Sequence, residues 1–327
     1  MSLRYYAHID RSGAIVLNGT ISCDAYFRGV TRMVITHAHR DHIKGFQLGI
    51  RRGVKVISTR ATRDLLSVLA NENPYRIQGL DYGERLEVEG GTIWLARSSH
   101  MLGAAQVVFE HEGGIRVVYT GDFRQPGTPI IESDILVMEA TYGKPEIVRP
   151  PREKIYEAFV ALVKSCLKKG PVNVIAYHGK LQEAMEVIRA HIPEIPFLAP
   201  RKVWLVSSIA ARYGMRLGEV IPMNSIEGIQ IARSNWYIAF LHSSMCAPRK
   251  GSSLILTGWC LSGIVRKLAS DRYVVALSGH ADFRQLLEYV EESKPKFVIV
   301  DGSRSSYAEI FAKEIRRRLK IEAVSMP

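Results

Sequence analysis

The stretch His37-Ala-His39-Arg-Asp41-His42, which directly follows the apolar run Met33-Val34-Ile35, decides the fold. Residues leaving an apolar strand are extended, so side chains two apart point the same way, and His37 and His39 can bind one ion. Asp41 and His42 follow where the chain bends and can reach a second ion nearby. Nitrogen and oxygen donors without cysteine favour a hydrolytic zinc or manganese centre over a structural zinc site. The alternative is a polar loop whose histidines only form hydrogen bonds.

The composition is typical of a globular protein that binds polyanions. At 327 residues, 47% of them hydrophobic, the chain can form one large or two ordinary domains. Lysine and arginine exceed aspartate and glutamate by 44 to 32, giving a net charge of +12. This excess favours nucleic-acid partners, because basic side chains displace counterions from phosphates.

The sequence predicts a cytoplasmic protein with no membrane contact. No apolar stretch approaches the roughly 20 residues that span a bilayer, and the N-terminus lacks the apolar core of a signal peptide. Oligomeric state is not encoded in any recognisable pattern. The cysteines are widely spaced and are expected to be reduced, buried thiols: Cys23, Cys166, Cys246 and Cys260.

The distribution of strand and helix patterns changes along the chain. Residues up to about 140 are rich in strand patterns, whereas helices and strands alternate beyond residue 150. Residues 193–227 give no clear prediction. Several metal-ligand residue types fall where predicted strands end, the usual place for active-site side chains. These are Asp24, His100, Asp122, Glu139, His280 and Asp301. A lone acidic residue at a strand end is usually a cap, but six such positions beside the histidine cluster favour a functional site.

The motifs together resemble the metallo-β-lactamase fold. The resemblance is carried by His37-x-His39-x-Asp41-His42, His100 before Leu102-Gly103, and Thr120-Gly121-Asp122. Two further motifs, Glu139-Ala-Thr-Tyr-Gly143 and Ser278-Gly-His280-Ala-Asp282, are similar to those of the β-CASP branch of nucleases. Within that branch the chain is most like ligase-associated DNA exonucleases and mRNA 3′-end processing factor-like proteins. The resemblance covers nearly the whole chain.

The resemblance implies a set of roles for these residues. His37, His39 and His100 would hold one divalent metal, Asp41 and His42 a second, and Asp122 would bridge them. Two metal ions are therefore expected, zinc in the first place, with manganese as an alternative at the second site. Asp24 would orient a ligand imidazole from behind. Asp41, Glu139 and His280 are the candidate catalytic residues, with His280 held by Glu139 to protonate the leaving oxygen.

One position departs from the family pattern. The last core strand ends Val298-Ile-Val-Asp301-Gly302, where the family usually has a histidine that binds the second metal. Asp301 is expected to serve as a shorter, negatively charged ligand, with a loosened second site or a single firm ion as alternatives. DNA-acting relatives also lack the histidine, so the change does not imply an inactive protein.

Two further residues are weaker candidates for phosphate binding. Lys180 lies at a predicted strand-to-helix turn, where free amides could hold a phosphate, or it could simply be a surface lysine at a helix start. Ser303 precedes the last predicted helix and could either cap it or contact phosphate.

The sequence therefore predicts an αββα metallo-β-lactamase sandwich with an inserted, reduced β-CASP domain. Residues 1–144 and 256–327 would form the sandwich, and residues 145–255 the insert. The expected function is metal-dependent hydrolysis of phosphodiester bonds, as a DNA exonuclease in repair acting on a single-stranded end. An RNA-processing nuclease is the alternative. Two less favoured alternatives are a small-molecule hydrolase of the same fold and a nucleic-acid-binding protein that has lost catalysis.

Overall fold

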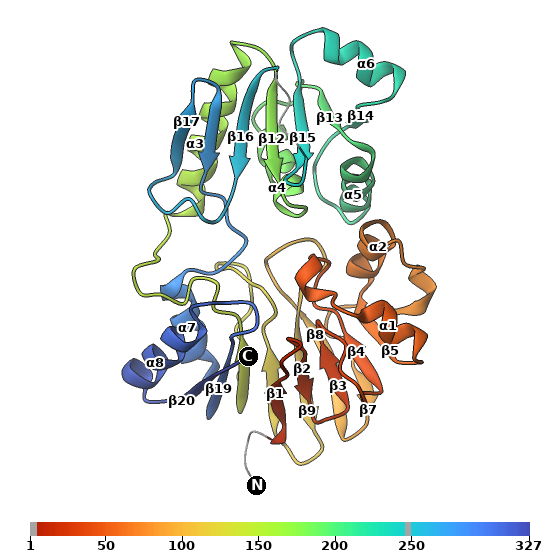
Figure 1. Cartoon of the computed structure of the whole chain (residues 1–327), viewed down its shortest axis with the longest axis vertical. Coiled ribbons are helices and arrows are strands. Elements are labelled where there is room, and N and C mark those ends of the chain that lie inside the picture. Colours follow the sequence, from red (N-terminus) through yellow and green to blue (C-terminus); the bar gives the residue numbers. More distant parts are fainter. Residues whose placement is uncertain (1–4, 246–249) are drawn as a thin grey trace. The chain divides into compact units, whose positions relative to one another are not determined.

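The computed structural model describes residues 5–245 and 250–327, which belong to two compact units (Figure 1). The first unit comprises Met1–Val148 and Gly279–Pro327, and the second comprises Arg149–Ser278. The first unit is thus formed from both ends of the chain, as expected for a sandwich carrying an insert. Within the described ranges no helix is both long and apolar enough to cross a bilayer.

Two sheets face each other in the first unit. The first has the order β1-β2-β3-β4-β5-β6 and the second the order β20-β19-β11-β10-β9-β8-β7. The strands of the first sheet are β1 (Ala7–Ile9), β2 (Ile15–Leu17), β3 (Ile21–Cys23), β4 (Arg32–Val34), β5 (Lys55–Thr59) and β6 (Ile77–Leu80). Those of the second are β7 (Leu86–Val88), β8 (Gly91–Arg97), β9 (Ala105–His111), β10 (Arg116–Tyr119), β11 (Ile135–Met138), β19 (Phe297–Asp301) and β20 (Glu322–Met326).

Apolar side chains from both sheets fill the space between them. Leu17, Val34 and Ile57 of the first sheet belong to the same buried cluster as Val107 and Val137 of the second. Side chains alternate along a strand, so each sheet can bury one face against its partner and leave the other for helices.

Helices cover the outer faces of both sheets (Figure 1). Helices α7 (Phe283–Ser293) and α8 (Ala308–Leu319) pack on the second sheet, where Tyr289 and Phe311 join a cluster with Val118, Leu136 and Val298. Helices α1 (Phe46–Arg51) and α2 (Arg60–Leu69) lie against strands β5 and β6. The layers are therefore α, β, β, α, which confirms the predicted sandwich.

The second unit is built on one largely parallel sheet with the order β14-β13-β15-β12-β16-β18-β17. Among the described strands of this sheet, only β17 and β18 pair in an antiparallel manner. The strands are β12 (Val172–Ala176), β13 (Phe197–Ala199), β14 (Val220–Pro222), β15 (Ile238–His242), β16 (Ser252–Leu256), β17 (Val265–Ala269) and β18 (Arg272–Val275). Its helices are α3 (Arg152–Leu167), α4 (Lys180–Arg189), α5 (Arg201–Arg212) and α6 (Ile226–Arg233). Parallel neighbours need such helical crossovers between them.

The chain returns to the sandwich later than the sequence suggests. The sequence placed the second boundary at residue 255, but β16 ends only at Leu256 and pairs in parallel with both β12 and β18. The segment up to Ser278 consequently belongs to the second unit. Strand periodicity shows that these residues form strands but not which sheet they join, so the boundary could not be placed from the pattern.

Local sequence signals explain how α7 begins. The Asp282 side chain accepts hydrogen bonds from the backbone N–H groups of Arg284 and Gln285, and the Gln285 side chain bonds back to the Asp282 N–H. This capping box places the N-cap residue of the helix two residues after His280. Cysteines 23, 166 and 260 are buried free thiols, as expected, whereas Cys246 lies outside the described residues.

Candidate metal centre

The candidate ligands lie in loops that follow strands of both sheets. His37 and His39 follow β4, and the short 3-10 helix Arg40–His42 turns the chain directly after them. His100 follows β8 and Asp122 follows β10. The two facing sheets thus bring residues far apart in the sequence to one edge of the sandwich.

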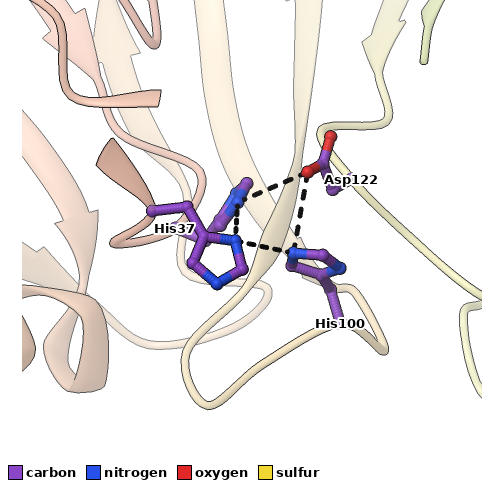
Figure 2. A group of neighbouring side chains, drawn as sticks. His37, His100 and Asp122 are labelled. Carbon is purple, nitrogen blue, oxygen red and sulfur yellow. Dashed lines mark hydrogen bonds and ion pairs between the residues drawn. The ribbon is translucent and has the colours of Figure 1, made fainter. Parts of the chain in front are cut away.

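Four of these side chains converge (Figure 2). The Nδ1 atom of His39 lies 3.1 Å from Nε2 of His37 and 3.0 Å from Nε2 of His100. The Asp122 Oδ2 atom lies 3.6 Å from each of those two Nε2 atoms. One potential ligand atom from each residue therefore points into a shared space, which identifies a group that could hold a metal ion.

Hydrogen bonds behind the imidazoles fix which nitrogen faces this space. The Nδ1 of His100 donates to the Gly279 carbonyl at 2.8 Å, leaving Nε2 as the atom with a lone pair. The Nδ1 of His37 donates to the Thr36 hydroxyl at 3.0 Å, and that hydroxyl donates to Asp24 Oδ2 at 2.7 Å. Both rings are thereby oriented with an acceptor nitrogen toward the centre.

This donor arrangement fits a divalent cation. The Nε2 atoms of His37 and His100 are both acceptors, and His39 Nδ1, at 3.0–3.1 Å from each, carries at most one proton, so a cation among the three nitrogens would be favourable. Ligand atoms bonded to one zinc at about 2.0–2.1 Å would lie roughly 3.3–3.4 Å apart in a tetrahedral arrangement. The observed spacing of 3.0–3.6 Å brackets that value. His37, His39, His100 and Asp122 could therefore hold one ion.

His42 extends the centre on the side of Asp122. Its Nδ1 donates to Asp24 Oδ2 at 2.7 Å, and its Nε2 lies 3.4 Å from Asp122 Oδ2 and 3.6 Å from Asp41 Oδ2. Among the described residues this buried Nε2 atom has no hydrogen-bond partner. An unpartnered buried nitrogen between two carboxylates suits a second cation, held by Asp41, His42 and Asp122.

The electrostatics of the cluster agree with a cation-binding role. Burial lowers the pKa of His37 and of His100 well below the usual value, so both imidazoles are neutral acceptors. Burial alone would also lower the pKa of His42, but the Asp122 and Asp24 carboxylates outweigh it and raise that pKa. Burial opposes ionisation of Asp122, yet the charge of His42 holds the pKa of Asp122 well below its usual value. Asp122 is thus an ionised carboxylate. The raised pKa of His42 shows that the surroundings of its ring favour positive charge.

A carboxylate–imidazole pair lies beside this cluster. The His280 Nδ1 lies 2.9 Å from Glu139 Oε2 and 3.9 Å from Asp122 Oδ2. Glu139 is itself held by the backbone N–H of Phe123, which donates to Oε1 at 2.8 Å. Because Nδ1 donates to Glu139, the Nε2 atom is the position from which His280 can deliver a proton.

Asp301 is hydrogen-bonded to residues of its own loop. Among the described residues, neither group of converging ligand atoms includes it. Its Oδ2 instead accepts from Arg304 Nη1 at 2.7 Å, and its Oδ1 accepts from the Ser303 N–H and hydroxyl. Metal binding by Asp301 stays a prediction; in this arrangement the carboxylate is hydrogen-bonded to Arg304 and Ser303.

The two candidate phosphate-binding residues, Ser303 and Lys180, both lie near acidic side chains. The Ser303 hydroxyl donates to Asp301 at 2.6 Å and accepts from Arg304, and its role in phosphate binding stays a prediction. Lys180 is the first residue of α4 in the second unit. Burial raises the pKa of Glu183, and the positive charge of Lys180 is one of the influences that oppose this rise. The role of Lys180 in phosphate binding stays a prediction.

Several supporting residues were missed by the sequence reading. Tyr119 donates to Asp24 Oδ2 at 2.8 Å, and Thr36 binds both oxygens of that carboxylate. Gly279 supplies the carbonyl to His100, and a Cβ atom at Gly279 would lie 2.9 Å from the His100 ring. The adjacency of Thr36 to His37 was a usable signal. The contact between His100 and Gly279 had no sequence signal, because these two residues are 179 positions apart.

The fold is of the metallo-β-lactamase type with an inserted domain, and it carries a cluster of side chains that could hold a metal ion. In agreement, residues 267–326 match the model of the Zn-dependent metallo-hydrolase RNA specificity domain. A crystal structure of a protein of unknown function from Enterococcus faecalis V583 has the same fold, with a TM-score of 0.61 and 13% identity over 93% of this chain and 81% of that one.

Sequence relatives identify the family within the metallo-β-lactamase fold. An uncharacterized protein in the lig 3′ region of Acidianus ambivalens is 42% identical over 42% of this chain and 99% of its own length. The transcription termination factor FttA of Methanothermobacter thermautotrophicus is 28% identical over 54% of this chain, and the DNA cross-link repair protein SNM1 of Arabidopsis thaliana is 24% identical over 90%. The chain belongs to the β-CASP nuclease family of the metallo-β-lactamase superfamily, which confirms the resemblance seen in its motifs. It spans only 34% of that FttA and 65% of that SNM1.

Proposed function

We propose that the protein is a metal-dependent phosphodiesterase that shortens single-stranded nucleic acid, with DNA in repair as its first substrate. The Glu139–His280 pair beside Asp122 is the observation that carries this proposal. A hydrolase of small thioesters or lactones needs the metal ligands but no proton donor for a sugar oxygen. The presence of such a residue beside the cluster, with its Nδ1 atom 3.9 Å from Asp122 Oδ2, therefore favours a nucleic-acid substrate over those compounds.

In the proposed reaction the ligand cluster binds the metal ion and His280 donates the proton. His37, His39, His100 and Asp122 would hold a divalent ion, whose chemistry when bound would be to lower the pKa of a nucleophilic water and to neutralise charge on the phosphate. Asp24 holds the imidazole of His42, and Gly279 that of His100, so neither ring has to reorganise.

Proton delivery is assigned to His280. Glu139 keeps the ring oriented through Nδ1 and stabilises its protonated form, and Nε2 donates to the leaving oxygen. Zinc is the first candidate for the ion, with a second ion, zinc or manganese, at Asp41, His42 and Asp122 as part of the same proposal.

The charge and the relatives support a nucleic-acid substrate. The net charge of +12 attracts phosphates. The second unit also exposes large aromatic side chains on which bases can stack: Tyr177, Trp236 and Trp259. RNA processing is the second candidate, favoured by the match to the RNA specificity domain. A cytoplasmic location, expected from the sequence, is part of the proposal.

The test uses the zinc-loaded protein with end-labelled single-stranded DNA and an RNA of the same sequence. Zinc and manganese are compared, and a chelator provides the metal-free control. Stepwise shortening of the DNA supports the first candidate, and shortening of the RNA alone supports the second. Early internal fragments would indicate an endonuclease. If neither polymer is cut by protein that retains its zinc, the proposal is overturned.

A further inference from the structure

The backbone that leads into His280 passes through a glycine that has to be held from outside. Gly279 supplies the carbonyl that accepts from His100 Nδ1, and a Cβ atom there would lie 2.9 Å from the His100 ring. This close approach requires glycine, the residue whose backbone is least restrained. Downstream the segment is fixed by the Ala281 N–H, which donates to the Phe123 carbonyl at 2.6 Å. A defined position for His280 therefore requires a restraint upstream of Gly279 as well.

Arg152 of α3 provides a restraint at that point. Its Nη2 donates to the Ser278 carbonyl at 3.3 Å, and both residues belong to the second unit. The Ser278 carbonyl and the Gly279 Cα atom lie in one planar peptide group, so a bond to this oxygen orients the backbone that enters Gly279. Only this one glycine separates the anchored peptide group from His280.

The Arg152 guanidinium is itself fixed by a mostly buried network. Its Nε and Nη2 both donate to Glu183 Oε1, and the Tyr156 hydroxyl donates to the same oxygen. Burial raises the pKa of Glu183, and the charge of Arg152 is the strongest influence that opposes this rise. A buried ion pair contributes little net stability, because both ions lose their hydration. Stability alone therefore does not account for this pair, whereas orientation of a backbone carbonyl does.

A second arginine holds the same part of the chain. Arg149, the first residue of the second unit, donates through Nη1 to the Gly258 carbonyl and through Nη2 to the Ala276 carbonyl. The two arginines at the entry to the second unit thus hold the segment by which the chain leaves it, at Ala276 and at Ser278.

We propose that Arg152 is a positioning residue for bond cleavage, which fixes the peptide group before Gly279 and thereby places His280 for proton transfer to the leaving oxygen. The inference rests on the proposed phosphodiesterase function and adds a residue of the second unit that acts through the acid. It requires no contact between Arg152 and the substrate. Placement matters because a misplacement of about 1 Å can lower a rate about a hundredfold.

The experiment compares two single-stranded DNA substrates that differ in one atom. The first has the natural leaving oxygen. In the second, sulfur replaces this oxygen, at the position identified from the products of the wild type. Because a thiol is a far stronger acid than an alcohol, sulfur leaves without a proton donor, and cleavage does not need His280. For each protein kcat and KM are measured on both substrates, bound metal by mass spectrometry, and stability by urea denaturation.

The full-length variants are Arg152→Met, Arg152→Lys, His280→Ala and the matched control Lys164→Met, which removes one positive charge from an exposed position of the same helix. On the oxygen substrate, Arg152→Met should lower kcat about ten- to hundredfold and leave KM within about threefold. On the sulfur substrate its loss should shrink to about threefold or less, as for His280→Ala. Arg152→Lys should recover part of kcat, because lysine keeps the charge but not the fixed fork of donors. Metal content should stay unchanged, and Lys164→Met should match the wild type on both substrates.

Two results would overturn the inference alone. One is a folded Arg152→Met protein with wild-type kcat on the oxygen substrate. The other is an equal loss on both substrates, which would make Arg152 important for the fold or the metal centre rather than for the acid. Should Arg152→Met fail to fold because Glu183 is left without its cation, the double variant Arg152→Met/Glu183→Gln carries the same expectation. If the wild type cuts neither substrate, or if His280→Ala loses equally on both, the proposed function or its acid is overturned, and the inference with it.

Discussion

Replacing Asp24 by asparagine tests whether the carboxylate behind His42 sets the affinity for metal. Asp24 is fully buried and accepts hydrogen bonds from the Thr36 N–H and hydroxyl, from His42 Nδ1 and from the Tyr119 hydroxyl, all at 2.7–2.8 Å. Its backbone φ is 60°, a left-handed conformation that asparagine also tolerates. Asp24→Asn therefore removes the charge without adding backbone strain.

The expected magnitude follows from this hydrogen-bond set. Three of the four donors converge on Oδ2, so the asparagine oxygen should occupy that position and turn its NH₂ group toward the Thr36 N–H. One buried donor is then unsatisfied, at about 1–3 kcal/mol, and the charge-assisted bond to His42 weakens by about 1 kcal/mol. The free energy of unfolding should fall by about 2–4 kcal/mol in total. Zinc affinity should fall about ten- to hundredfold, because His42 is no longer held as a basic ligand.

The assay is competition for zinc against a chromophoric chelator, together with urea denaturation of the metal-free protein. Tyr119→Phe is the matched control, since it removes one donor to the same Asp24 oxygen but leaves His42 in place. It should lower stability by about 1 kcal/mol and leave zinc affinity unchanged. The reasoning is refuted if Asp24→Asn is destabilised but binds zinc as tightly as the wild type, because the carboxylate would then serve the fold alone.

Three further predictions follow from the centre. Asp122→Ala should lower the bound metal by at least one equivalent, because its Oδ2 lies 3.4–3.6 Å from the Nε2 atoms of three histidines; full metal content would contradict the bridging role. His280→Ala should reduce the rate of hydrolysis at least about a hundredfold with metal content unchanged, whereas removal of the exposed His191 should leave the rate intact. Chelation should abolish activity and lower the unfolding temperature, and added zinc or manganese should restore both, since ions bind only the folded centre; activity that survives chelation would exclude a metal-dependent mechanism.

The histidine cluster was predictable because its geometry is local. Residues 37–42 are consecutive, and strand extension followed by a bend fixes which side chains share a direction. His100 and Asp122 were recognisable because they terminate strongly apolar strands. The strand patterns and the motif similarity also sufficed for the sandwich, in which those loops meet at one edge of the two sheets.

The hydrogen bonds of Asp301 could not be predicted from the sequence. A position at the end of a core strand says that a carboxylate is near the centre, but not which way its oxygens point. The direction is set by Arg304 and Ser303, which bind both oxygens, and no periodicity encodes that choice. The late boundary at Ser278 has a similar cause, because a strand pattern does not record which sheet a strand joins.

The carbonyl of Gly279 has a consequence for the order in which the protein matures. A growing polypeptide leaves the ribosome from its amino end, so His37, His39 and His100 emerge long before the glycine that orients His100 and the histidine that follows it. Strands β19 and β20 and their two covering helices arrive in the same final portion. An unfinished polypeptide thus lacks the proposed acid for bond cleavage, two strands of the second sheet and the helices that cover that sheet.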